Sequence, residues 1–234
     1  MSGAGYGQFC PIAKAMEILG EKWTLLIVRE LIMGGSRFNE MQRGLSQISP
    51  TLLTKRLHAL EQQGLVIKRK IHGMRGYEYF PTDACRELMP VIEQIGHWGM
   101  RWARDEMSGS DFDLELLMLY LQRSIDCDKL PGNETVIRFN FSDVEDYQTW
   151  WLVVTDDKVD VCVHDPGKEV DVYFNVGLQT MCELWMGDIS YKRAIADGRL
   201  ELVGPAGLTR NVSHWLSPSI FAGIAPARQI LEPA

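Results

Sequence analysis

Hydrogen-bonding and basic side chains share one side of a segment in the first half of the chain, SQISPTLLTKRLHALEQQGL (46–65). In a helix, four of them fall at i, i+3, i+4 and i+7: Thr51, Thr54, Lys55 and His58. Hydroxyl, ammonium and imidazole groups on one helix face can bind base edges and phosphates in a major groove. The spacing therefore predicts a helix that contacts DNA.

More basic residues surround this segment. They are Arg37 before it, and Lys68, Lys70, His72 and Arg75 after it. Such groups neutralise backbone phosphates, which gives affinity and salt dependence without sequence choice. Ser49 precedes the helix, where a phosphate can meet the positive end of the helix dipole. Taken singly, each basic residue is equally well explained as a solvated surface group or as protection for an edge strand.

Catalytic and metal-binding chemistry finds little support. His164, Asp165 and His214 are candidate bases, but no nucleophile elbow, phosphate loop, dinucleotide fingerprint or carboxylate pair accompanies them. The five cysteines, Cys10, Cys85, Cys127, Cys162 and Cys182, lack metal-ligand or disulfide spacing. We expect no catalytic residues, no metal and no cofactor.

The elements that position the predicted DNA contacts follow from helix signals. Ser49 can cap the helix, Pro50 suits its first position, and Gly64 ends it. Three shorter apolar stripes precede it, and the run LVIKRKIH (65–72), the turn GMRG (73–76) and YEYFP (77–81) predict a hairpin. Short helices followed by a two-stranded wing make a winged helix-turn-helix.

A long apolar stripe follows Thr82, which caps the predicted helix. Its members include Leu88, Val91, Ile95, Trp98 and Trp102. A stripe this rich in apolar residues needs a partner surface, and we expect a dimer interface there.

The pattern changes after the polar stretch at 108–113, so we predict two domains, 1–107 and 108–234. Four segments between 135 and 176 alternate apolar and polar residues, which predicts an antiparallel meander, and helical patterns return from residue 178. The fold class is α+β: a winged helix-turn-helix followed by an antiparallel sheet with helices.

Charge is divided between these halves. The whole chain has a formal net charge of −7, but residues 1–107 carry +3 and residues 108–234 carry −10. Fields separated by more than about 10 Å are largely screened at ordinary salt, so the acidity of the second half does not exclude DNA binding by the first. The chain shows no signal peptide or apolar membrane span, and we expect a cytoplasmic protein with no membrane partner.

The first half resembles the HxlR family of bacterial winged-helix regulators over about residues 8–105. The resemblance rests on CPIAKAMEILGEKWTLLIVREL (10–31), RFNEM (37–41), ISPTLLTKRLHALE (48–61), YEYFPT (77–82) and WGMRW (98–102). It implies a homodimer that pairs through the first and last helices of the domain and places the helix containing Pro50 in operator DNA. Some members of that family are redox sensors with a cysteine at the position of Cys10, which also fits an inert helix-start residue.

The second half resembles the sterol carrier protein type two fold, most clearly in WMGDISYKRAIADGRLELVG (185–204). That resemblance implies an apolar tunnel for a hydrophobic small molecule. Its candidate lining is apolar and aromatic: Phe139, Phe141, Trp151, Val153, Val161, Phe174, Met181, Trp185 and Trp215. Residues of these types more often form a plain core.

Three hypotheses remain open at this point. The first is a homodimeric HxlR-type regulator of double-stranded operator DNA whose second domain binds a hydrophobic molecule. The second keeps the regulator and makes that domain a dimerisation or partner-docking module without ligand. The third is a lipid carrier or enzyme with a vestigial winged helix, and removing the charges of Lys55, Lys68 and Lys70 distinguishes it from the others.

Overall fold

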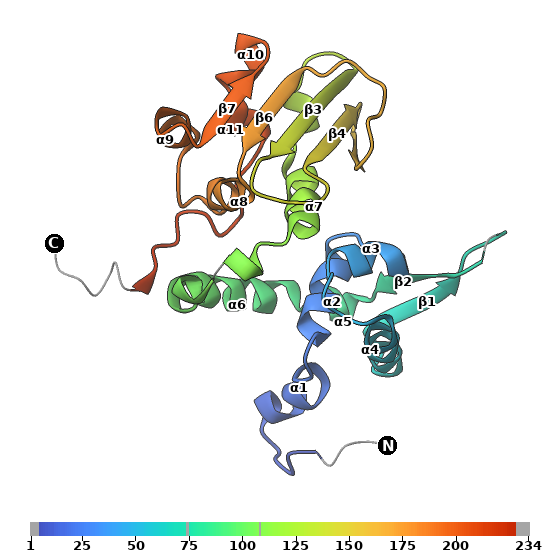
Figure 1. Cartoon of the computed structure of the whole chain (residues 1–234). Coiled ribbons are helices and arrows are strands. Elements are labelled where there is room, and N and C mark those ends of the chain that lie inside the picture. Colours follow the sequence, from blue (N-terminus) through green and yellow to red (C-terminus); the bar gives the residue numbers. More distant parts are fainter. Residues whose placement is uncertain (1–4, 74, 108, 228–234) are drawn as a thin grey trace. The chain divides into compact units, whose positions relative to one another are not determined.

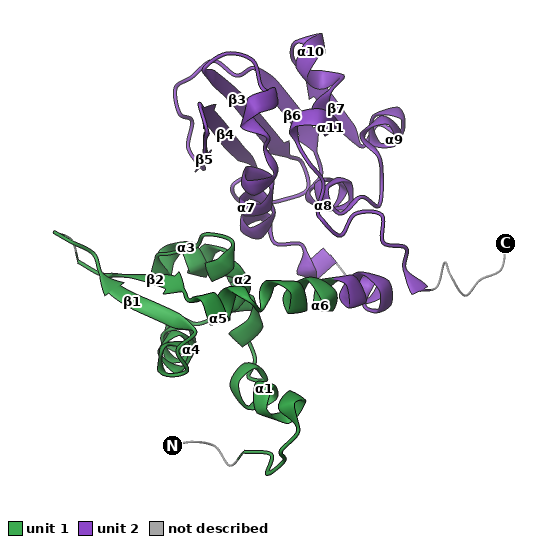
Figure 2. Ribbon diagram, turned by 180° about the vertical axis from the view of Figure 1, so that it is seen from behind, with its two compact units in different colours: residues 1–96 green, residues 97–234 purple. Residues whose placement is uncertain are grey.

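The computed structural model describes residues 5–73, 75–107 and 109–227. The chain divides into two compact units, residues 1–96 and 97–234 (Figure 2). Helix α6 (Met89–Trp102) contributes residues to both units. The predicted domain boundary after residue 107 therefore stays a prediction.

The first unit consists of short helices and one hairpin. Its elements are α1 (Pro11–Leu19), α2 (Thr24–Ile32), α3 (Phe38–Arg43), α4 (Pro50–Gln62), β1 (Val66–Lys70), β2 (Tyr77–Pro81), α5 (Asp83–Arg86) and the start of α6. Ile27, Leu53 and Leu57 lie at the centre of its core and are almost fully buried. The leucine face of α4 thus packs inward, and its polar face remains at the surface.

Helix α4 begins and ends where the sequence signals predict. The Ser49 hydroxyl accepts a hydrogen bond from the Leu52 N–H at 3.3 Å, and Pro50 is the first helical residue. Gly64 has a φ of +71°, a left-handed conformation that a side chain would strain. The chain can therefore turn directly into β1.

Strands β1 and β2 pair antiparallel, with Lys68 opposite Tyr79. They form a hairpin that projects from the helices of the first unit (Figure 1). This confirms the predicted wing.

The prediction of a single helix after Thr82 is wrong in one respect, because the structure has two helices there. The Thr82 hydroxyl accepts from the Cys85 N–H at 3.3 Å and caps the short α5, and α6 starts again at Met89. Pro90 has no N–H to donate to the preceding turn, which explains a break just before it.

The second unit combines a five-stranded sheet with helices. Its strands are β3 (Glu134–Phe141), β4 (Thr149–Thr155), β5 (Lys158–Cys162), β6 (Val172–Val176) and β7 (Leu200–Val203). Its helices are the end of α6, η1 (Arg104–Glu106), η2 (Gly109–Asp111), α7 (Leu114–Ser124), η3 (Cys127–Lys129), α8 (Leu178–Met186), α9 (Tyr191–Ala196), α10 (Ala206–Thr209) and α11 (Val212–Trp215). The predicted α+β class is confirmed.

The sheet order, β5-β4-β3-β6-β7, differs from the expected meander. Strands β3, β4 and β5 are antiparallel neighbours, but β6 pairs in parallel with β3. Residues 163–171 carry the chain from the β5 edge to the far side of β3, where Asp171 exchanges hydrogen bonds of 2.8 and 2.9 Å with the Val136 backbone. Apolar alternation identifies a strand and its two faces, but it does not identify the neighbouring strand.

Apolar side chains from one face of this sheet meet the helices. Phe139 and Phe141 from β3 pack with Met118 of α7, Met181 of α8 and Trp215 of α11. Among the described residues, no helix is long and apolar enough to cross a membrane.

Candidate nucleic-acid interface and ligand cavity

The polar face of α4, which we call the reading face, consists of Thr51, Thr54, Lys55 and His58. All four are exposed. The Thr54 hydroxyl donates to the Pro50 carbonyl at 2.9 Å, which leaves its methyl group and oxygen lone pairs available. His58 Nδ1 lies 3.6 Å from a Glu61 carboxylate oxygen. Lys55 has no ion pair within the described chain and is the reading-face charge most open to a phosphate or base.

Several wing cations are exposed, but they are held differently. The Lys68 ammonium lies 4.1 Å from the centre of the Tyr77 ring and 5.9 Å from that of Tyr79. Lys70, His72 and Arg75 extend toward the tip of the hairpin and are exposed. The contact of the Lys68 ammonium with the two tyrosine rings fixes the Lys68 side chain relative to the strands at little cost in conformational entropy.

Arg37 lies at the base of the wing. Its Nε is 3.5 Å from Glu78 Oε1 on β2, so part of its charge is already compensated.

The backbone N–H groups of Ser36 and Arg37 both donate to the Glu40 carboxylate at 2.9 Å. Burial raises the pKa of Glu40, but these hydrogen bonds outweigh it and hold the pKa below its ordinary value. The carboxylate thereby caps α3.

One basic wing residue was missed at the sequence level. Arg69 is exposed, and its guanidinium lies 5.2 Å from the Phe80 ring centre. Strand alternation places it on the opposite face of the hairpin from Lys68 and Lys70. The sequence shows the charge of Arg69, and the structure adds its contact with the Phe80 ring.

The apolar residues predicted for a dimer interface divide into two groups. Val91, Ile95, Trp98 and Trp102 form an exposed row that we call the α6 stripe, and Trp98 has 62% of its surface exposed. Leu88 differs, because it precedes the helix and packs partly buried against the core of the first unit. Helix α1 has no buried residue, and Ile12 is 73% exposed.

The cysteines are all unpaired thiols. Cys10 precedes α1, partly exposed, and its side chain makes no capping hydrogen bond. Burial is the main cause that raises the pKa of Cys85, and it raises the pKa of Cys182 to about 12. Within the described ranges, no cluster of three or more His, Cys, Asp and Glu residues could hold a metal ion.

The predicted ligand-pocket residues divide among packed groups in the second unit. Five of them are core residues in mutual contact or in one cluster: Phe139, Phe141, Phe174, Met181 and Trp215. The ring centres of Phe139 and Phe174 are 4.6 Å apart, and those of Phe174 and Trp215 are 6.1 Å apart. Close packing of this kind leaves no room for a ligand between the rings.

Trp151 and Val153 belong to a separate cluster with Val136. Side chains alternate along a strand, and Trp150, Leu152 and Val154 occupy the main core, so Trp151 and Val153 face the other side of the sheet. Val161 and Trp185 lie at the periphery of the main core, and the Trp185 indole stacks on Tyr120 at 4.6 Å. Apolar character does not distinguish the wall of a cavity from a packed core.

Two surface cavities lie in the second unit, and one predicted pocket residue, Phe141, lines the smaller of them. The larger, of about 840 Å³, is lined by Tyr191, Lys192, Ile195, Gly198, Leu200, Glu201, Leu202, Thr209, Arg210, Val212 and Ser213. Burial raises the pKa of the Tyr191 phenol. The smaller cavity, of about 470 Å³, is more polar and includes Asn140, Asn175 and Arg199.

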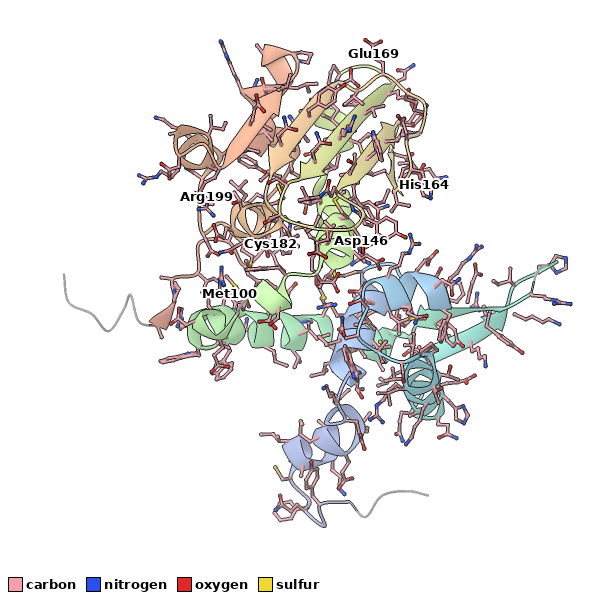
Figure 3. The ribbon with its side chains drawn as sticks, viewed as in Figure 1. Met100, Asp146, His164, Glu169, Cys182 and Arg199 are labelled. Carbon is pink, nitrogen blue, oxygen red and sulfur yellow. The ribbon has the colours of Figure 1, made fainter. Side chains whose placement is uncertain are left out.

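The candidate bases lie on the surface. His164 is in the exposed segment after β5 (Figure 3), and the Asp165 carboxylate accepts from the Gly167 N–H at 2.8 Å. His214 is exposed on α11. The structure thus gives Asp165 a turn-forming role.

The short helices of the first unit, the exposed polar face of α4 and the β1–β2 wing after it define a winged helix-turn-helix. Residues 18–107 match the HxlR-like helix-turn-helix family, and residues 118–217 match the SCP-2 sterol transfer family. The chain belongs to the HxlR-like helix-turn-helix family.

Its relatives include two HTH-type transcriptional regulators of Bacillus subtilis. YvaP is 36% identical over 98 residues, which is 41% of this chain and 90% of YvaP. YdeP is 35% identical over 95 residues, which is 40% of this chain and 73% of YdeP. Each of these matches covers less than half of this chain.

Similar solved structures include the reduced form of the transcriptional regulator YodB from B. subtilis. It is 29% identical, with a TM-score of 0.35, and the match covers 39% of this chain and 92% of YodB. The reduced form of the redox regulator HypR is 32% identical, with a TM-score of 0.37, and covers 39% of this chain and 91% of HypR.

Proposed function

We propose that this protein is a transcriptional regulator that binds double-stranded operator DNA as a homodimer. The observation that carries the proposal is the exposed reading face of α4 beside a wing rich in basic residues. A helix of this size fits a B-DNA major groove about 12 Å wide. In this arrangement Thr51, Lys55 and His58 contact bases or groove walls, and Lys68, Lys70, His72 and Arg75 contact phosphates.

The homodimer is supported by two apolar surfaces that the described residues leave uncovered. The α6 stripe is about half exposed or more at each position, and α1 buries none of its residues. A second copy would bury both surfaces in a two-fold arrangement. Such a dimer presents two α4 helices to half-sites about one turn of DNA apart, roughly 34 Å.

For the second unit, we propose binding of a hydrophobic small molecule in the larger cavity. Its volume of about 840 Å³ suits an ordinary ligand, and Tyr191, Ile195, Leu200 and Leu202 give it apolar walls. Binding there would change DNA affinity if the two states of the regulator bind the ligand differently. Regulation in the cytoplasm, rather than catalysis, is the role we propose for the whole chain.

The DNA proposal is tested with duplexes enriched by the protein from a random library. The triple variant Lys55→Gln, Lys68→Gln and Lys70→Gln removes three proposed contacts, and the triple variant Lys129→Gln, Lys158→Gln and Lys168→Gln removes the same charge from the second unit. The first should weaken binding and reduce the salt slope by about one for each lost phosphate contact. Equal effects of the two variants, or no enrichment at all, would refute the proposal.

The ligand proposal is tested by native mass spectrometry after incubation with palmitate or cholesterol. Wild-type protein should retain one of these molecules, and Ile195→Trp, which fills the cavity from a half-exposed position, should retain less. Failure of both molecules to bind favours the alternative, a dimerisation or partner-docking module without ligand.

A further inference from the structure

Arg56 lies in the middle of α4 but away from its reading face. Helical geometry places it about 100° around the axis from Lys55 and roughly 200° from both Thr54 and His58. Its side chain is 12% exposed and therefore points toward the protein. This position indicates that Arg56 contacts the rest of the protein on a side of α4 away from the reading face.

The partner of Arg56 is the turn that joins α1 to α2. Its Nε–H donates to the Lys22 carbonyl at 3.1 Å, and its Nη2 donates to a Glu21 carboxylate oxygen at 2.5 Å. The guanidinium fork thus makes a backbone contact and a charged contact at once, across a sequence separation of 34 and 35 residues. Such a two-point contact restrains rotation as well as distance.

The turn itself has a costly conformation. Trp23 has a φ of +79°, which is rare for an aromatic residue, and its side chain does not cap α2. Trp23 packs partly buried against the core of the first unit, and the Lys22 ammonium lies 5.6 Å from its ring centre. A turn held in this way presents the Lys22 carbonyl at a fixed place.

The turn is also tightly connected to α1. A Cβ at Gly20 would lie 2.5 Å from the Met16 carbonyl oxygen, so the chain can make this turn only with glycine. Since α1 buries none of its own residues, its position is fixed by this turn and by whatever covers its apolar side.

We infer that Arg56 is a positioning residue that ties α4 to the α1–α2 turn and so makes base recognition depend on the position of α1. The inference rests on the proposed DNA-binding function. It assigns Arg56 a role without any contact to DNA, since its guanidinium is already engaged by Lys22 and Glu21.

The test compares Arg56→Gln, Arg56→Lys and wild type on two duplexes of equal length: one enriched by wild type from a random library, and its scrambled version. Arg56→Gln should lower the ratio of specific to non-specific affinity about tenfold, the value of about one base contact. Arg56→Lys keeps a charge that can reach Glu21 and should recover part of the ratio. Lys158→Gln in the second unit removes the same charge from an exposed position and is the control.

The salt slope separates positioning from direct contact. It should not change in Arg56→Gln, whereas loss of a phosphate contact would reduce it by about one. An unchanged affinity ratio, or a reduced slope, overturns the inference.

A second variant covers the case in which Arg56→Gln does not fold. Glu21→Gln changes a surface carboxylate that is 65% exposed, and it should lower the ratio about threefold, since it weakens one of two contacts. No change in that ratio overturns the inference. If wild type enriches no duplex, the proposed function fails together with the inference, whereas normal enrichment with unaffected variants overturns the inference alone.

Discussion

Trp98 offers a quantitative test of the proposed homodimer. It lies in the middle of the α6 stripe, and 62% of its surface is exposed in the described chain. A Trp side chain can bury up to about 250 Å², so about 150 Å² of Trp98 is available to a second copy. At about 25 cal/mol per Å², full coverage contributes about 4 kcal/mol for each copy.

Two-fold symmetry counts Trp98 twice, which sets an upper bound of about 8 kcal/mol for the dimer. Alanine keeps part of the contact, and ordering the indole costs side-chain entropy, so we expect Trp98→Ala to lose about half of this bound. A loss of about 4 kcal/mol raises the dimer dissociation constant about 1,000-fold, since each 1.4 kcal/mol is about tenfold.

Sedimentation velocity over a dilution series measures that constant. Tyr147→Ala is the control, because Tyr147 is 66% exposed but lies outside α1 and α6. Circular dichroism should show that both variants remain folded. A Trp98→Ala dimer as tight as wild type would contradict the proposed interface, as would a wild-type protein that stays monomeric at the highest concentration of the series.

Two further predictions concern the second unit. Burial raises the pKa of Cys182 from 9.0 to about 12, so between these pH values the folded state keeps a proton that the unfolded state loses. The free energy of unfolding should therefore fall as the pH rises from about 9 to 12. Cys182→Ala should show a shallower alkaline decline in urea titrations, and parallel curves for the two proteins would exclude this role. The Trp215 indole N–H donates to the Leu208 carbonyl at 3.0 Å inside the core, and Trp215 is 1% exposed. Trp215→Phe should therefore lower the free energy of unfolding by about 2–4 kcal/mol, because it leaves a cavity and an unpaired carbonyl. A change under about 1 kcal/mol would show that the core closes around phenylalanine.

Helix α4 could be predicted because its local signals agree with its packing. Ser49, Pro50 and Gly64 set its ends within the sequence itself, and the leucine spacing separates the buried face from the reading face. The side-chain contacts of that face could not be predicted. The bond from Thr54 to the Pro50 carbonyl and the ion contact of His58 depend on rotamers that periodicity does not determine.

The second unit shows where sequence patterns stop being informative. Its strands and helices follow from alternation and turn residues, but the parallel pairing of β6 with β3 depends on the path of residues 163–171. Trp150 and Trp151 are both nearly buried, so the two-residue period of β4 is hidden by apolar residues on both faces. For this reason the sequence alone does not separate Trp151 and Val153 from the residues of the main core.

The place of β3 in the sheet also affects how the second unit folds while the chain is being synthesised. Strand β4 emerges directly after β3 and can pair with it at once, and β5 can then pair with β4, but the other edge of β3 waits for β6, whose residues lie 35 positions further along the chain than their partners in β3. Until then, backbone groups beside Phe139 and Phe141 are unpaired and open to other nascent chains. We expect nascent chains stalled so that residue 162 has left the ribosomal exit tunnel but residue 172 has not to carry a chaperone-dependent, aggregation-prone second unit, and emergence of residues 172–203 to end that vulnerable interval.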